Sequence, residues 1–139
     1  MHFELETGPG HFISAAEPGR VRIGARDYTA SLIVTPERIV DDWPVPHIGA
    51  LGDADMARLR EFQPQIVLIG TGASLVFPDV EIYARLLADG IGVEFMNTPA
   101  ACRTYNLLAS ERRRVAAGLV ITAGTRALST SERVKRARQ

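Results

Sequence analysis

The chain has 139 residues, enough for one domain with a sizeable hydrophobic core. Its 16 basic and 16 acidic side chains cancel, so no overall charge favours nucleic acid or an anionic membrane as a partner. A single cysteine, Cys102, excludes a disulfide framework, and no apolar run reaches the ~20 residues of a membrane span. No basic start precedes a hydrophobic stretch, so we predict no secretory signal and a cytoplasmic location.

The charge is unevenly spread along the chain. Residues 1–121 hold 11 basic and 15 acidic side chains, a net charge of −4, whereas residues 122–139 hold 5 and 1, a net charge of +4. The second segment is also rich in serine, threonine and arginine and has no apolar periodicity. We therefore predict a single domain over residues 1–121, followed by a basic, disordered tail over residues 122–139.

The first forty residues have the composition of β structure. β-Branched and aromatic residues dominate three short segments, and Pro18-Gly19 separates the first two as a hairpin turn would. A meander of three strands is predicted, with one further short extended piece before a proline-containing loop. The three strands are expected within residues 11–15, 21–23 and 28–34, and the short piece within residues 37–40.

The second half alternates helical and strand patterns. Asp53 is expected to cap a first helix, Pro78-Asp79 begins a second helix that ends at Gly90, and Thr98 is expected to cap a third. The strands between and after them are nearly continuous apolar runs, as in parallel sheets covered on both faces. This order predicts a right-handed β-α-β-α-β core. Its first helix should span residues 54–62, and its strands residues 66–69, 92–96 and 115–121.

Polar residues follow two of these strands. In an open α/β sheet, ligands bind beyond the carboxyl ends of parallel strands, and the amide groups at a helix start can receive an anion. The segment Gly70-Thr71-Gly72 lacks both the third glycine of a dinucleotide loop and the Gly-Lys-Ser/Thr end of a Walker loop. We interpret it as a tight turn that needs a positive φ, and we expect Thr98 to lie near it.

Three side chains have a functional and a structural interpretation. Glu94 is either an acidic group in a pocket or one half of a buried ion pair, with Arg103 or Arg113 as its partner. Trp43 either contacts a partner or covers that pocket, or it packs under its own loop. Cys102 lies near a helix start, which can activate a thiol, but a small buried side chain is the commoner outcome.

Three segments in the second half resemble a known family. They are the apolar run ending in Gly70-Thr71-Gly72, the strand running into Asn97-Thr98, and residues 101–113. In order and spacing, over roughly residues 10–121, they are similar to the Mth-type domain of unknown function, a family that includes the mitochondrial complex I assembly factor 3.

The resemblance implies an α/β fold in three layers. A central mixed sheet would have helices on one side and the N-terminal β meander with a helix on the other. One strand would run antiparallel to the rest, which leaves two alternatives for the closing strand: parallel, as its pattern predicts, or the antiparallel strand of the family. Positions that match the family motifs form the expected pocket, together with Trp43: Gly70, Thr71, Gly72, Glu94, Thr98, Thr104, Tyr105 and Asn106.

Two functions remain open at this point. Because no nucleophile, acid–base pair or metal set is assignable, the first is a non-enzymatic binding or assembly module that docks a protein partner, by analogy assisting a respiratory complex. The second is a site for a small anionic ligand, with or without catalysis, around Glu94 and the turn at residues 70–72. No cofactor, metal, nucleic-acid partner or membrane span is predicted.

Overall fold

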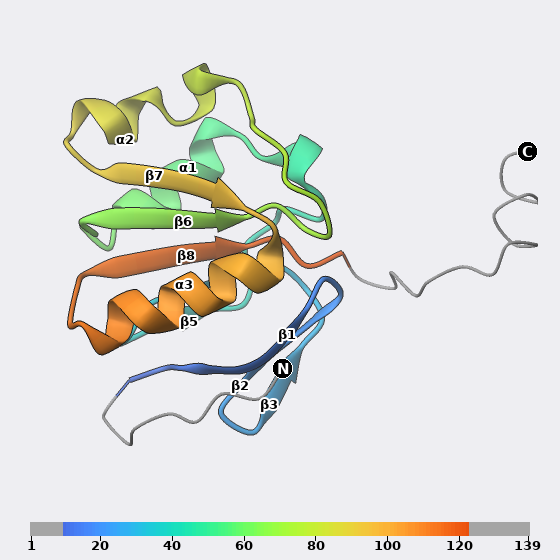
Figure 1. Cartoon of the computed structure of the whole chain (residues 1–139). Helices are drawn as coiled ribbons and strands as arrows, with labels where there is room; N and C mark the ends of the chain where they lie inside the picture. The colour runs from blue at the N-terminus through green and yellow to red at the C-terminus, as the bar shows by residue number, and fades with distance from the viewer. Residues whose placement is uncertain (1–9, 123–139) are drawn as a thin grey trace, which may run out of the picture.

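The computed structural model describes residues 10–122; residues 1–9 and nearly all of the predicted basic tail, from residue 123, lie outside them. Two β-sheets and three α-helices make up the described part of the chain (Figure 1). The strands of the smaller sheet are β1 (Ile13–Glu17), β2 (Arg20–Ile23) and β3 (Arg26–Tyr28). Those of the larger sheet are β4 (Leu32–Val34), β5 (Ile39–Val40), β6 (Ile66–Gly70), β7 (Gly92–Met96) and β8 (Val115–Leu119). The helices are α1 (Asp53–Arg60), α2 (Ala84–Ala88) and α3 (Thr98–Ser110), with short 3₁₀ helices η1 (Ile48–Ala50) and η2 (Val80–Ile82).

The larger sheet has the order β5-β4-β8-β6-β7 and is mixed. Strands β7 and β8 both run parallel to β6, so the predicted parallel β-α-β-α-β core is confirmed. The single opposed strand is β4, which pairs antiparallel with both β8 and β5. Of the two alternatives for the closing strand, the parallel one is therefore confirmed. Since long helical segments connect β6 to β7 and β7 to β8, parallel pairing is the expected outcome for these three.

The N-terminal meander is present, but its third predicted strand divides between the two sheets. Residues 26–28 pair with β2, whereas residues 32–34 pair with β8. Between them, the Ser31 hydroxyl donates to the carbonyl oxygen of Val45 at 2.5 Å and accepts from the amide of Ile121 at 2.9 Å. Contacts to segments distant in sequence thus interrupt a stretch that is uniformly rich in β-forming residues.

Two helix starts differ from the prediction by one residue. Asn97, not Thr98, caps α3: its side-chain oxygen accepts from the amide of Ala100 at 2.9 Å, and Pro99 follows within the first turn. Helix α1 is preceded by Gly52, whose amide donates to the carboxylate of Asp55 at 2.9 Å. Asp53 therefore lies inside the first turn, where the interaction of its carboxylate with the helix dipole is favourable.

The second predicted helix is shorter than expected. The segment from Pro78 to Gly90 forms η2 and then the five-residue α2, with a non-helical residue at Tyr83. Gly90 ends it with a φ of +80°, in agreement with the prediction for that position.

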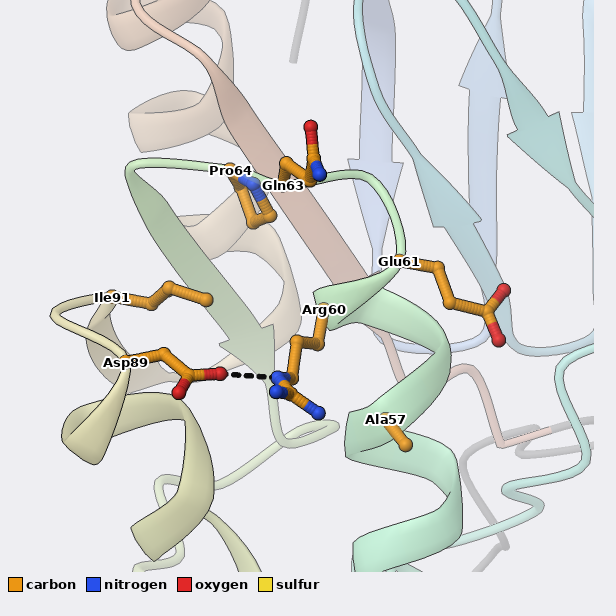
Figure 2. Close-up of a pocket in the computed structure, with 7 residues that line it drawn as sticks. All are labelled: Ala57, Arg60, Glu61, Gln63, Pro64, Asp89 and Ile91. Carbon is orange, nitrogen blue, oxygen red and sulfur yellow. Dashed lines mark hydrogen bonds and ion pairs between the residues drawn. The ribbon is translucent and has the colours of Figure 1, made fainter.

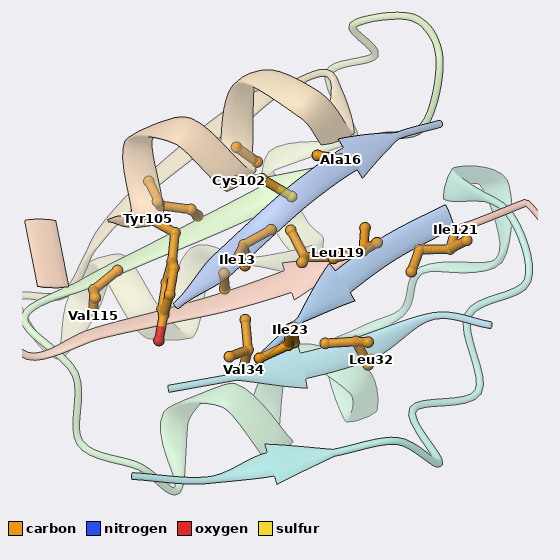
Figure 3. Packing of buried hydrophobic residues seen from close by; sticks show 14 of the residues in the cluster. Ile13, Ala16, Ile23, Leu32, Val34, Cys102, Tyr105, Val115, Leu119 and Ile121 are labelled. Atoms are coloured by element: carbon orange, nitrogen blue, oxygen red, sulfur yellow. The ribbon is translucent and has the colours of Figure 1, made fainter. Parts of the chain in front are cut away.

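Three layers result, as the family resemblance implied. One hydrophobic cluster fills the space between the larger sheet, α3 and the smaller sheet, and includes Ile13, Tyr105 and Leu119 (Figure 3). A second cluster lies on the opposite face beneath α1 and α2 and includes Met56 and Leu86. Each such fully buried side chain stabilises the fold by roughly 1.5–3 kcal/mol. Helices α1 and α2 therefore cover one face, and α3 with the meander covers the other.

Candidate functional site

The predicted rim brings Gly70, Gly72 and Thr98 together at the carboxyl ends of the parallel strands. The buried Thr98 hydroxyl accepts from the amide of Gly72 at 2.9 Å and donates to the carbonyl of Val120 at 2.7 Å. Its own amide donates to the carbonyl of Gly72 at 2.8 Å. The strand ends and the start of α3 are thus joined directly to one another. The Thr98 hydroxyl and the Gly72 amide both have hydrogen-bond partners within the fold.

Close approach explains the first glycine of this turn. A Cβ at Gly70 would lie 2.9 Å from both Cα and Oγ1 of Thr98, closer than real contacts of this kind. Gly72 has a φ of +99°, the conformation predicted for a tight turn. Both glycines are needed for the packing of α3 against the strand ends, which is a structural role.

Thr71 fixes the loop that leaves this turn. Its hydroxyl donates to the carbonyl of Ser74 at 2.5 Å and accepts from the amide of Val76 at 3.2 Å. The side chain is almost fully buried. The backbone of residues 71–76 is therefore held by internal hydrogen bonds.

Trp43 lies on the opposite face of the sheet from α3, in the second cluster. Its indole nitrogen donates to the carbonyl of Asp55 at 3.2 Å, and its ring packs against Gly118 so closely that a Cβ there would lie 2.6 Å from a ring carbon. Only 3% of the residue is exposed. The ring therefore lies between α1 and β8, on the other face of the sheet from α3.

Three further predicted residues lie on α3, and two of them hold the meander. The Tyr105 hydroxyl donates to the carbonyl of His11 at 2.6 Å, and the Asn106 amide bonds both backbone groups of Ile13 at 2.9 and 2.8 Å. Burial, together with the charge of Glu37, raises the pKa of Tyr105. Thr104 is half-buried on the same helix. Tyr105 and Asn106 thus join α3 to the start of the meander, more than 90 residues earlier in the chain.

Glu94 is exposed on β7, which is an edge strand of the larger sheet. The sequence argument required a strand covered on both faces, and that premise does not hold at an edge. Within residues 10–122 Glu94 forms no ion pair, so neither Arg103 nor Arg113 is its partner. The carboxylate is solvated and separate from the buried Thr98 hydroxyl.

Cys102 is fully buried in the first cluster. Burial raises the pKa of its thiol to about 12, although Arg103 nearby opposes the shift. The thiolate is the reactive form, so this cysteine acts as a small apolar side chain. In the described part of the chain, no three histidine, cysteine or carboxylate side chains come together as metal ligands would.

The loop that follows the Thr98 rim exposes large apolar side chains, which the sequence argument missed. Phe77 is 71% exposed, Val80 55%, Leu75 49% and Val76 39%. We refer to these four residues as the apolar loop patch. In the sequence they include the run Leu75-Val76-Phe77, three consecutive apolar residues in a segment without helical or strand periodicity, a pattern that does not by itself indicate exposure.

The patch is anchored to the sheet by aromatic contacts. The ring of Phe77 meets that of Phe95 on β7 edge-on, with centroids 6.3 Å apart, and Tyr83 contacts the same ring at 4.9 Å. Exposed carboxylates of Asp79 and Glu81 flank Val80. A neighbouring molecule would therefore meet an apolar surface with an acidic border.

Two cavities lie at the opposite end of the larger sheet, where β6 and β8 begin. The first, of about 620 Å³, lies between α1 and the segment after α2, where the Arg60 guanidinium faces and pairs with the Asp89 carboxylate (Figure 2). The second, of about 610 Å³, shares Pro64 with the first and lies beside the end of α3. Neither is lined by any of the nine predicted site residues.

Known proteins with a similar sequence or structure identify the family to which this fold belongs. The fold and the surface define a small α/β domain with a mixed sheet and an apolar loop patch. Residues 13–120 match the family model described as a protein of unknown function, DUF498/DUF598. The chain belongs to this family, and the predicted membership of the Mth-type family is confirmed. Among residues 10–122, no helix has the length and apolar character needed to cross a bilayer.

Three relatives illustrate the range of the family. A "13 kDa major membrane protein" of Francisella tularensis is 31% identical over 98 residues, 70% of this chain and 80% of that protein. The zebrafish (Danio rerio) NADH dehydrogenase [ubiquinone] 1 alpha subcomplex assembly factor 3 is 32% identical over 122 residues, 84% of this chain and 68% of that protein. A Bordetella pertussis protein described as an Mth938-like domain has a solution structure with a TM-score of 0.72, 28% identity and coverage of 87% and 94% of the two chains.

Proposed function

We propose that this domain is a non-enzymatic docking module that binds a protein partner through the apolar loop patch. The 71% exposure of Phe77, which directly follows the hydrogen-bonded segment at residues 71–76, is the observation that carries the proposal. A large aromatic ring in that position offers contact area without the entropic cost of ordering a flexible segment. The similarity to an assembly factor supports a role in bringing proteins together.

The chemistry of the patch specifies the partner. Its acidic border, formed by Asp79 and Glu81, favours a partner that presents an apolar side chain beside basic groups. By analogy with complex I assembly factor 3, a subunit or assembly intermediate of a respiratory complex is the partner we expect. The cytoplasmic location predicted from composition belongs to this proposal and is checked by fractionating cells.

The alternative, a small-anion site at the turn of residues 70–72, has less support. The Gly72 amide donates to the Thr98 hydroxyl, and the Asn97 side chain already accepts from the Ala100 amide at the start of α3. An anion would have to displace these internal bonds in order to bind there. We therefore assign a structural role, holding the loop in place, to four residues: Gly70, Thr71, Gly72 and Thr98.

Photo-crosslinking in cells tests the docking surface. p-Benzoylphenylalanine in place of Phe77 should give a discrete adduct with a second protein, identified by mass spectrometry. The same group in place of Leu107, which is 58% exposed on α3, should give none and serves as the matched control. The adduct should disappear when Val80→Asp is added. An adduct of equal yield from position 107, or one that survives Val80→Asp, contradicts the proposal.

The assembly role has its own readout. In cells that lack this protein, Leu107→Ser should restore the amount of assembled respiratory complex, whereas Phe77→Ser should not. Circular dichroism melting checks that both variants fold. Equal restoration by the two variants would exclude the patch from assembly.

A further inference from the structure

The second cavity is a groove lined by four arginines, and we refer to it as the arginine groove. Arg38 reaches it from the loop before β5, and Arg112, Arg113 and Arg114 come from the connection between α3 and β8. One carboxylate, that of Glu37, also lines it. The formal charge of the lining is therefore +3, on a molecule whose whole-chain charge is zero.

Of the seven other arginines in residues 10–122, five pair with a carboxylate and two, Arg85 and Arg103, do not. Arg22, Arg58 and Arg60 each pair with an aspartate. Within residues 10–122, none of the four groove arginines has a carboxylate partner. The Arg114 Nε–H donates to the carbonyl of Gln63 at 3.3 Å, which fixes that side chain on one side only. Adjacent positive charges without counter-charges repel one another, and an anion in the groove would relieve this repulsion.

The backbone at Arg112 supports the same conclusion. Its φ is +59°, and the amide of Arg113 donates to the carbonyl of Leu108 at 3.1 Å, as in the turn that commonly ends a helix. Glycine is the usual residue there, because a side chain with a Cβ strains the backbone in this conformation. The fold therefore does not require arginine at this position.

The walls of the groove indicate what kind of anion fits. Phe12, Phe62 and Pro36 contribute apolar surface, and the volume of about 610 Å³ falls in the range of ligand sites. The groove adjoins the carboxyl end of α3, where helix carbonyls carry partial negative charge, and it contains Glu37. A compact phosphate would be repelled by both. Carboxylates distributed along a chain with an apolar residue match the arginines and the rings better.

We propose that the arginine groove binds an acidic peptide segment of a protein partner. Its carboxylates pair with Arg38 and the three arginines at residues 112–114, and an apolar side chain packs against Phe12 and Phe62. Guanidinium groups suit this role because they bind carboxylates through two parallel hydrogen bonds. The groove lies at the opposite end of the sheet from the apolar loop patch, so this second contact is independent of the function proposed above.

Fluorescence anisotropy with the full-length protein tests the groove. The probe is a fluorescein-labelled peptide that carries two glutamates on each side of one phenylalanine, and its neutral counterpart has glutamines instead. The acidic peptide should bind more tightly than the neutral one, and its affinity should fall as salt rises from about 50 to about 200 mM. No preference for the acidic peptide overturns the proposal.

Matched variants locate the binding. Arg113→Glu should weaken binding at least about tenfold, whereas Arg103→Glu, the same charge change at an exposed position of α3 outside the groove, should have a much smaller effect. Arg112→Gly should weaken binding without lowering the unfolding midpoint. Weaker binding by this variant is then due to the missing guanidinium and not to unfolding. Equal effects of the substitutions at positions 103 and 113 refute the site.

Two further measurements test the class of ligand and the independence of the two surfaces. If inorganic pyrophosphate displaces the probe at a concentration below the dissociation constant of the peptide, the groove is a phosphate site and the peptide assignment is wrong. Phe77→Ser should bind the acidic peptide as the wild type does. A loss of binding in that variant would overturn the independence of the two surfaces.

Discussion

Thr98→Val removes one buried hydroxyl and keeps the volume of the side chain. In the native protein this hydroxyl satisfies the Gly72 amide and the Val120 carbonyl. Thr98 is fully buried, so water cannot easily replace it. Leaving a buried polar group without a partner costs about 1–3 kcal/mol, and with two such groups we expect a loss of about 3 kcal/mol.

Thr98→Ser is the matched control. It keeps the hydroxyl and deletes one methyl group, for which we expect a loss of about 1 kcal/mol. Urea denaturation followed by circular dichroism measures both. With a slope of about 1.5–2 kcal/mol per molar urea, the midpoint should fall by about 1.5–2 M for valine and about 0.5 M for serine. A valine variant as stable as the serine variant would refute the view that Thr98 joins the strand ends.

Three other substitutions and one alkylation reaction test the packing. Gly118→Ala places a Cβ 2.6 Å from the Trp43 ring, so we expect a loss of about 1–3 kcal/mol and a red shift of tryptophan fluorescence, measured by urea titration. Burial raises the pKa of Cys102 to about 12, so at pH 9 its alkylation by iodoacetamide should be slow in the folded protein and fast in urea; rapid alkylation of the native state contradicts the burial. Because the unfolded thiol ionises near its ordinary pKa of 9.0, this group should also lower stability as pH rises from 9 toward 12, an effect that Cys102→Ala should remove. Arg112→Gly should raise the unfolding free energy by roughly 1 kcal/mol, because its φ of +59° suits glycine; a lower midpoint would contradict this.

Much of the second half could be predicted from the sequence because its signals are local. The run at residues 66–69 has the continuous apolar pattern of a covered strand, and the segment Gly92–Met96 is a short strand bounded by turn signals; both lie where predicted. The helix start at Asn97-Thr98 was misplaced by one residue because either side chain can cap a helix. The choice is made by Val120, a distant residue whose carbonyl binds the Thr98 hydroxyl.

The site was harder to predict than the fold. Strand order decides whether Glu94 is covered, and the sequence contains no direct signal that β7 lies at an edge. An apolar run such as Leu75-Val76-Phe77 ordinarily predicts burial, so its exposure emerges only when the loop is placed. The arginine groove likewise collects residues from segments far apart in the chain, around Phe12, Arg38 and residues 109–115.

The position of β8 has a consequence for biosynthesis. Among the strands of residues 10–122 it is the last to be made, yet it lies between β4 and β6. Until Leu119 has left the ribosome, β8 cannot pair with β4 on one side and β6 on the other. Both of these strands then expose an unpaired edge. The meander is delayed as well, because Asn106 on α3 must be synthesised before it can hold Ile13. A chain that is stalled or truncated before residue 119 is thus open to pairing with other chains.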